Sequence, residues 1–284
     1  MPVLDWVRTD LNFITPTGGR TLRFEKSAFV AFDLFLLRRP DAEKDYSEQE
    51  ISKATDHFKD MTESEKEALK KVCLQALPGS TTGFTPEQVL ELLDEYKGIS
   101  RAQLQQHLIL FLKEISPLAD ELDMQLAIHP DDPPFAVLGL PRIMNTEADA
   151  RFMLEAVPNK SNGLCFCSGS FGARSDNDLA GMIRRLGSRI YFLHPRSTQR
   201  DMEGNFHEAD HLAGDANMFS LMKEVVDLMQ REDRAIPLRP DHGHEILDDK
   251  GKGHYPGYSA IGRLKALAEL RGLEMGIRLS NKLK

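Results

Sequence analysis

The chain has 284 residues, of which 41% are hydrophobic, and this content is sufficient for a substantial buried core and excludes a globally disordered chain. Its 36 Lys and Arg residues are outnumbered by 44 Asp and Glu residues, which gives a formal net charge of −8 at pH 7. This balance argues against non-specific nucleic-acid binding and against docking on anionic membranes, because both depend on basic surface.

Targeting and anchoring segments are not visible in the sequence. No apolar run reaches the roughly 18 residues that a membrane span requires, and the first ten residues, MPVLDWVRTD, lack the basic and apolar regions of a signal peptide. The three cysteines, Cys73, Cys165 and Cys167, do not form the pattern of a disulfide framework. We therefore expect a reduced, cytoplasmic protein.

The first third of the chain is predicted to contain a hairpin followed by helices. Residues 11–26 surround a Pro-Thr-Gly-Gly turn and predict two short strands. From residue 27 to about 123 the pattern is helical, with a long final segment whose apolar residues recur near a period of 3.6. Three helix starts have capping signals, namely Ser47 with Glu50, Thr62 with Glu65, and Thr85 before Pro86.

Beyond residue 123, short apolar runs alternate with amphipathic helical stretches. The apolar runs are 124–130, 163–169, 189–195, 235–244 and 273–279, and the helical stretches lie near 146–156, 176–187, 216–232 and 258–271. This alternation predicts parallel βα units. Five such strands fit either part of a (β/α)8 barrel or an open doubly wound sheet.

Four of the five predicted strands end in reactive side chains. One residue from each of these ends can ligate a metal, and the four are His129, Cys167, His194 and Asp241. Because functional groups in parallel α/β folds gather at the carboxyl ends of the strands, we expect these side chains to point into one site. Two imidazoles, a thiolate and a carboxylate suit a divalent transition ion such as zinc, iron(II) or manganese(II).

Each of these residues also has a purely structural interpretation. A histidine after a strand is often just a hydrogen-bonded residue, a buried cysteine is usually inert, and an aspartate before His-Gly-His can cap a turn. Coincidence at four successive strand ends is less probable than one shared site. Cys165 would share a strand face with Cys167, which we prefer as the ligand because it lies nearer the loop. The pair His207 and His211, four positions apart, is a weaker signal, since it can hold a metal only if the segment is helical, and we expect a helical or loop segment near the site.

Several longer motifs carry a resemblance to a known family. They are HPDDPP, CSGSFGARSDNDL, LHPRST, FHEADHLAGD, RPDHGH and PGYSAIGRLKALAELRG. With these motifs the chain closely resembles the mannonate dehydratase family, and the similarity runs over the whole chain. The resemblance implies a (β/α)8 TIM barrel of the xylose-isomerase-like type. It also implies a lyase that removes water from D-mannonate to give 2-dehydro-3-deoxy-D-gluconate in hexuronate (glucuronate) breakdown, with Mn²⁺ or Fe²⁺.

The resemblance also implies roles for individual residues. It places the metal on His129, Cys167, His194 and Asp241, the same four residues that end the predicted strands. It makes His242 and Tyr258 the acid–base pair without dividing the two roles between them. It implies substrate contacts for Arg196, Trp6 and Arg8. The implied partner is a small sugar acid, with no nucleic acid and no membrane, and a homo-oligomer is an open alternative.

One departure from the family concerns the N-terminus. Family members are longer there, and MPVLDW resembles the end of their third strand. We therefore expect residues 1–284 to form a single incomplete barrel with about strands 4–8, N-terminally truncated, in which residues 27–98 are a helical insertion. Two other functions remain open. One is another metal-dependent sugar isomerase or epimerase on the same scaffold, and the other is an inactive truncated homologue that at most binds a partner chain.

Overall fold

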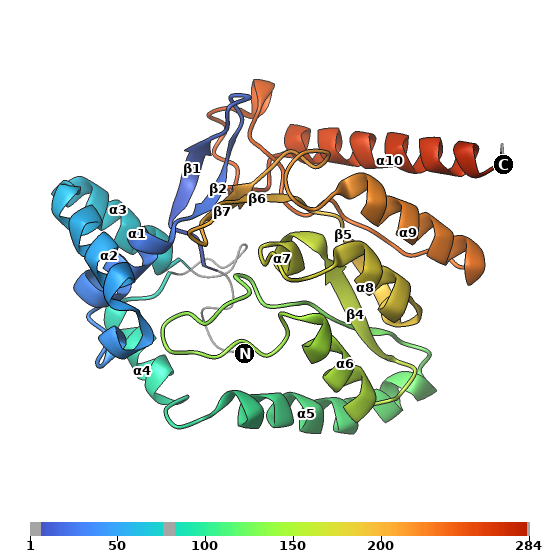
Figure 1. The fold of residues 1–284 in the computed structure, drawn as a ribbon, viewed down its shortest axis with the longest axis horizontal. Coiled ribbons are helices and arrows are strands. Elements are labelled where there is room, and N and C mark those ends of the chain that lie inside the picture. The colour runs from blue at the N-terminus through green and yellow to red at the C-terminus, as the bar shows by residue number, and fades with distance from the viewer. Residues whose placement is uncertain (1–6, 76–82, 283–284) are drawn as a thin grey trace.

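The computed structural model describes residues 7–75 and 83–282, and its strands form two sheets (Figure 1). One sheet has the strand order β1-β2-β7-β6 with antiparallel neighbours, and the other has the order β3-β4-β5 with parallel neighbours. The strands are β1 (Asp10–Ile14), β2 (Arg20–Phe24), β3 (Leu126–Ile128), β4 (Asn162–Cys167), β5 (Ile190–His194), β6 (Thr198–Arg200) and β7 (Phe206–Glu208).

Helices account for most of the remaining described residues. The α-helices are α1 (Lys26–Ala31), α2 (Glu48–Asp60), α3 (Glu63–Cys73), α4 (Pro86–Asp94), α5 (Arg101–Glu121), α6 (Glu147–Ala156), α7 (Ser168–Gly172), α8 (Leu179–Leu186), α9 (Met218–Arg231) and α10 (Ala260–Lys282). A π-helical segment η1 (Phe32–Leu37) continues α1, and 3-10 turns lie at η2 (Ala42–Asp45), η3 (Gly187–Arg189) and η4 (Leu247–Asp249).

The predicted helix starts in the first third of the chain are confirmed. At the start of α2 the Ser47 side chain accepts a hydrogen bond from the Glu50 backbone N–H, and the Glu50 carboxylate accepts one from the Ser47 N–H. Thr62 and Glu65 form the same reciprocal pair at α3, and Thr85 caps α4. These bonds satisfy backbone N–H groups that the first turn of a helix leaves without partners.

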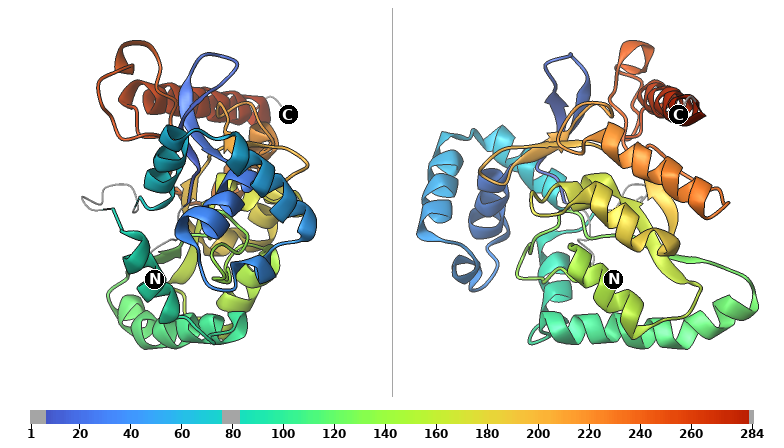
Figure 2. Two further views of the ribbon diagram at one scale, coloured as in Figure 1. Left: turned by 90° about the vertical axis from the view of Figure 1, so that its left-hand side faces the viewer. Right: turned by 45° about the vertical axis from the view of Figure 1, so that its right-hand side comes forward.

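The predicted hairpin is also confirmed, and it joins the first helices to the rest of the molecule. Phe24 on β2 stacks on Phe206 of β7 with ring centroids 5.5 Å apart, and both belong to a core cluster that includes residues of α1, α3 and α4. At its other end the hairpin contacts the 245–258 loop through an isolated bridge from Arg20 to Glu245. Figure 2 shows this hairpin and loop projecting together from the body of the molecule.

Three of the five predicted parallel strands are present as β3, β4 and β5. Along β4, Leu164 and Phe166 pack into the main hydrophobic core with residues of α6, α8 and α9. Because successive side chains of a strand point to opposite faces, Cys165 and Cys167 lie on the other face. The α/β fold with a parallel sheet is thus confirmed, and the helices cover the face opposite the two cysteines.

The predicted fourth strand is only partly formed. In the run 235–244, Leu238 makes an isolated parallel bridge with Leu193, and two backbone hydrogen bonds join this run to β5. Prolines at 237 and 240 limit the ladder, since proline donates no backbone hydrogen bond. The run therefore lies beside β5 without extending the sheet as a regular strand.

The predicted fifth strand, 273–279, is wrong, because these residues are the last turns of α10. The alternating apolar residues of LEMGIRL imitate a strand, but Met275 and Leu279 are exposed. Leu270 and Ile277 are buried and Leu273 packs against the same core, a spacing of three, four and seven residues that belongs to one helix face.

The expected set of strands 4–8 is therefore not seen in full, because the parallel sheet within residues 7–75 and 83–282 has three strands and is open at β3. In the long helical segment, the apolar residues Leu110, Phe111 and Leu118 of α5 and Leu122 directly after it are exposed. Among the helices of the described residues, none combines the length and apolarity of a membrane span.

Candidate metal centre

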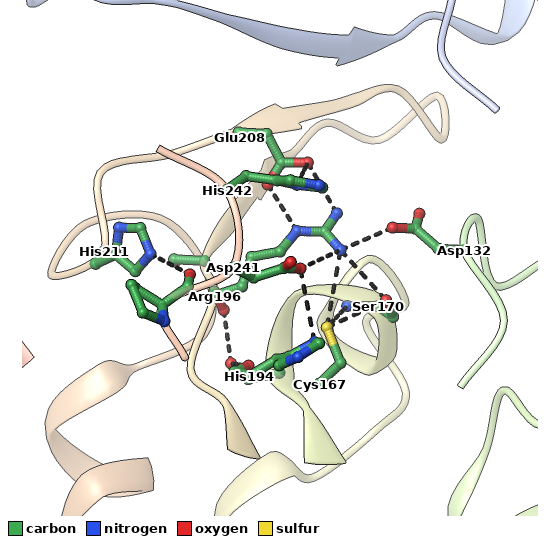
Figure 3. A network of polar contacts seen from close by, with 12 residues as sticks. Asp132, Cys167, Ser170, His194, Arg196, Glu208, His211, Asp241 and His242 are labelled. Carbon is green, nitrogen blue, oxygen red and sulfur yellow. Dashed lines mark hydrogen bonds and ion pairs between the residues drawn. The ribbon is translucent and has the colours of Figure 1, made fainter. Parts of the chain in front are cut away.

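Three of the four predicted metal ligands converge at the carboxyl edge of the parallel sheet. Cys167 and His194 are paired in register at the ends of β4 and β5, and Asp241 lies in the run 235–244, three residues after Leu238, which bridges β5. Their ligand atoms all lie within 4.8 Å of one another, and the three side chains are buried (Figure 3). We call Cys167, His194 and Asp241 the inner triad.

The fourth predicted ligand, His129, lies directly beside this triad. It follows the edge strand β3, and the residue is exposed, but its Nε2 is 3.2 Å from His194 Nδ1. Its Nδ1 is 2.7 Å from the Pro130 carbonyl oxygen. Since that oxygen can only accept, Nδ1 carries a proton, and Nε2 is the nitrogen available to a metal.

The surroundings of Cys167 favour a thiolate. Burial alone would raise its pKa, but the His129 charge, hydrogen bonds from His129 and His194, and the Arg196 charge hold the pKa of Cys167 well below its ordinary value. The Ser170 backbone N–H and hydroxyl lie 3.4 and 3.3 Å from Cys167 Sγ and donate to it. A thiolate is the form of cysteine that binds metals.

The same charges act on His129 and Asp241. Loss of water around the His129 ring disfavours its charged form, but the Cys167 charge and hydrogen bond and the Asp241 charge raise the pKa of His129 to about 9. Burial would raise the pKa of Asp241, whereas the charges of His242, Arg196 and His194 lower it to about 2. The charges of Cys167 and Asp241 thus favour a protonated His129 ring, and a divalent ion held by these residues would replace its Nε2 proton.

A buried network of two arginines and two carboxylates forms the wall next to the inner triad. The Asp132 carboxylate accepts from Arg8 at 3.0 and 2.9 Å and from Arg196 at 2.7 Å. The Glu208 carboxylate accepts from Arg196 at 2.7 and 2.9 Å and from Arg8 at 3.1 Å. All four side chains are at most 6% exposed, so each charge depends on the others for its compensation.

The predicted acid–base pair lies at the edge of this network. His242 Nδ1 is 3.1 Å from a Glu208 carboxylate oxygen, and the rings of His242 and Tyr258 meet edge to face with centroids 5.4 Å apart. Burial and the Asp241 charge raise the pKa of Tyr258 to about 12. Near this pair, Gly262 at the start of α10 packs against the backbone of the preceding loop, where an added Cβ would lie 2.0 Å from the His244 carbonyl oxygen.

The predicted substrate contacts have different positions in the structure. Arg196 borders the inner triad, with Nη1 3.8 Å from Cys167 Sγ and 3.9 Å from Asp241 Oδ2. Arg8 lies deeper, and its guanidinium is held by Asp132 and Glu208. Trp6 lies outside the described residues. His207 and His211 do not form a helical pair, since His207 belongs to strand β7.

Three further residues of the site were not assigned from the sequence, namely Asp132, Ser170 and Glu208. Each stands inside one of the long motifs, in HPDDPP, CSGSFG and FHEADH. The motifs were the only signal for Asp132 and Glu208, because the arginines that contact them lie 12 to 200 positions away along the chain, whereas Ser170 donates to Cys167 only three positions away.

Glutamine at position 208 is expected to destabilise the protein strongly, because it leaves Arg8 and Arg196 without one buried counter-charge. Burial would raise the Glu208 pKa, but Arg196, His242 and Arg8 hold it well below its usual range. A lowered carboxylate pKa stabilises the fold above the unfolded-state pKa of about 4.3, and this stabilisation is lost as the pH falls through the folded-state pKa. Urea unfolding of Glu208→Gln at pH 7 should show a loss of about 3–5 kcal/mol.

The difference between Glu208→Gln and the unmodified chain should shrink as the pH falls below about 4. The matched control is Glu203→Gln, because Glu203 forms an exposed ion pair with Lys53, and such pairs contribute about 0–1 kcal/mol. If Glu208→Gln and Glu203→Gln had the same free energy of unfolding at every pH in this range, the Glu208 network would not stabilise the fold.

Together, the fold and the site define an α/β protein with a candidate transition-metal centre at the carboxyl edge of its parallel sheet and a candidate acid–base pair beside it. A family model described as D-mannonate dehydratase (UxuA) matches residues 1–284. The chain belongs to this family.

Relatives of known name agree with this membership. A mannonate dehydratase of Marinomonas sp. (strain MWYL1) is 48% identical over 284 residues, which are 98% of this chain and 73% of the relative. Mannonate dehydratase 1 of Agrobacterium fabrum (strain C58 / ATCC 33970) is 46% identical over 283 residues, 96% of this chain and 70% of the relative.

A solved structure also matches. The crystal structure of mannonate dehydratase from Streptococcus suis serotype 2 superposes with a TM-score of 0.71 at 28% identity, and the match covers 99% of this chain and 64% of that one. The chain thus spans less than two thirds of the solved relative and about 70% of the others. Because the family model and the relatives match nearly all of this chain, they lend no support to the expectation of an N-terminal truncation.

Proposed function

We propose that this chain removes water from D-mannonate to give 2-dehydro-3-deoxy-D-gluconate, using Mn²⁺ or Fe²⁺ held by His129, Cys167, His194 and Asp241. The observation that carries the proposal is the convergence of the inner triad within 4.8 Å, directly beside His129 and the pair of His242 and Tyr258. Family membership supplies the substrate class and the reaction.

The donor set fits the proposed ion. Two imidazole nitrogens, one thiolate and one carboxylate are ligands that divalent transition ions accept, whereas calcium takes an all-oxygen shell. When bound there, the ion supplies Lewis acidity that stabilises negative charge developing on the substrate carboxylate and its α carbon. The Ser170 donors hold the Cys167 thiolate in place, and the Pro130 carbonyl orients the His129 ring.

The surroundings of His242 and Tyr258 support one division of the acid and base roles. A phenol with a pKa of about 12 stays protonated at neutral pH, so Tyr258 suits donation of a proton to the leaving C3 hydroxyl. Glu208 contacts His242 at Nδ1, and we assign Nε2, on the opposite side of the ring, as the acceptor of the α proton. Arg196 borders the inner triad and is the first choice for a substrate contact. Arg8 supports Arg196 through their shared partners Asp132 and Glu208. Trp6 is a further candidate for a substrate contact.

For the whole chain we propose a single domain of the xylose-isomerase-like (β/α)8 barrel type. In it, β3, β4, β5 and the run 235–244 would be consecutive barrel strands, and residues 27–98 would be a helical insertion. The parallel register of the three strands and the position of the ligands at their carboxyl ends support this arrangement. The free thiols Cys73, Cys165 and Cys167 support a reducing compartment, and we propose the cytoplasm.

The function is tested by incubating the purified chain with D-mannonate and either Mn²⁺ or Fe²⁺. The expected product is a 2-keto-3-deoxy acid, recognised by NMR from the new methylene group at C3. An epimer or ketose without this methylene would identify the alternative isomerase or epimerase. Unchanged D-mannonate with a full complement of metal would identify an inactive homologue.

A further inference from the structure

Cys165 is a buried thiol that the proposed dehydration does not use. It lies on β4 two residues before Cys167, on the same strand face. With His129 and His194 it forms a second set of three ligand atoms that all lie within 4.8 Å of one another. We call His129, Cys165 and His194 the outer triad.

The two triads differ in their chemistry. The inner triad offers one nitrogen, one sulfur and one oxygen, whereas the outer triad offers two nitrogens and one sulfur. Imidazole and thiolate without carboxylate are the ligands of zinc sites, and thiolates select soft or borderline ions over Mn²⁺. We propose that the outer triad is a second metal site, which binds a d¹⁰ ion of the zinc group, Zn²⁺ or Cd²⁺.

The position of the outer triad allows an ion to enter. His129 is exposed at the open edge of the sheet, next to β3, while Cys165 and His194 are buried behind it. An ion that arrives at His129 therefore meets the sulfur and the second imidazole on its inner side. Binding replaces the S–H bond of Cys165 with a metal–sulfur bond, and the proton leaves to water.

The two sites exclude each other, because the outer triad shares His129 and His194 with the proposed Mn²⁺ or Fe²⁺ centre. His194 Nδ1 lies 3.2 Å from His129 Nε2 and 3.8 Å from Asp241 Oδ2, so the same nitrogen faces both triads. The single lone pair of His194 Nδ1 can bind only one metal ion at a time. An ion in the outer triad therefore displaces the Mn²⁺ or Fe²⁺ of the inner triad and inhibits turnover, a consequence that rests on the proposed function.

The site is tested with Cd²⁺, because a cadmium–thiolate bond gives a charge-transfer absorption in the ultraviolet. Metal-free Cys167→Ala, in the full chain, has lost the only sulfur of the inner triad. Titration with Cd²⁺ is expected to give this absorption with one ion per chain. The band should persist in Cys73→Ala/Cys167→Ala, since Cys73 belongs to a separate core cluster, and should vanish in Cys165→Ala/Cys167→Ala. No band in folded Cys167→Ala would overturn the proposal.

A second measurement does not depend on the folding of Cys167→Ala. The unmodified chain and Cys165→Ala are loaded with Mn²⁺, Cd²⁺ is added, and released Mn²⁺ is followed by electron paramagnetic resonance. Cys165→Ala is expected to need at least about ten-fold more Cd²⁺ for half release. Equal Cd²⁺ requirements would contradict the outer triad alone, whereas Mn²⁺ binding by Cys167→Ala as tight as that of the unmodified chain would contradict the proposed dehydratase centre alone.

Discussion

Replacing Cys167 with alanine is expected to abolish stoichiometric Mn²⁺ or Fe²⁺ binding and to lower kcat/KM for D-mannonate by more than about 100-fold. Residues that only orient a metal ligand typically contribute 10–100-fold, and Cys167 is proposed as a ligand itself. The charges of His129 and Arg196 and two hydrogen bonds from Ser170 stabilise the Cys167 thiolate. The alanine variant leaves these groups without the anion that they contact.

The measurement is metal content by elemental analysis, followed by turnover at saturating metal. Cys73→Ala is the matched control, because Cys73 is also a buried free thiol but lies in the cluster formed by the hairpin and the first helices. It should keep its metal and its turnover. Retention of a full metal complement by Cys167→Ala would remove Cys167 from the set of ligands.

The second large effect is expected at the acid–base pair. His242→Asn and Tyr258→Phe should each lower kcat by about 10²–10⁴-fold, the range for loss of a general acid or base. Neither residue is a proposed ligand, so both variants should bind the same amount of metal as the unmodified chain. Asparagine can still approach Glu208, and phenylalanine preserves the edge-to-face contact between the two rings.

Tyr255→Phe is the control for the tyrosine variant. Tyr255 lies three positions before Tyr258, the two rings are 5.9 Å apart, and its hydroxyl accepts from the Gln75 side chain instead of facing the triad. Its turnover should therefore be nearly unchanged. Rates close to those of the unmodified chain for both His242→Asn and Tyr258→Phe would exclude the pair from the chemistry.

Features of the fold that depend on neighbouring residues could be predicted from the sequence. The caps at Ser47 and Thr62 need only a partner three residues later, and the hairpin needs only its turn. The prediction of a strand at 273–279 is wrong. An alternating apolar pattern over seven residues fits a strand, whereas the burial of Leu270 and Ile277 on one helix face is decided by tertiary packing.

The candidate site shows the same division. The convergence of the four candidate ligands was predictable because each lies near the end of an apolar run, and parallel strands bring their ends to one edge. The network around them was not predictable, since Asp132 and Glu208 acquire their roles only from arginines distant in the sequence. The outer triad was not predictable either, because Cys165 becomes a candidate ligand only through its distance from His129 and His194 in the fold.

The contrast between the short-range caps and the long-range network has a consequence for the order of folding. In the described part of the chain, five helices (α2, α3, α4, α5 and α6) begin with reciprocal caps closed within three residues. Arg8 instead reaches partners 124 and 200 residues away. Local contacts form early because they require little loop closure. We therefore expect the capped helices to nucleate first, and the segment around Arg8 to dock against the candidate metal centre as a late step of folding.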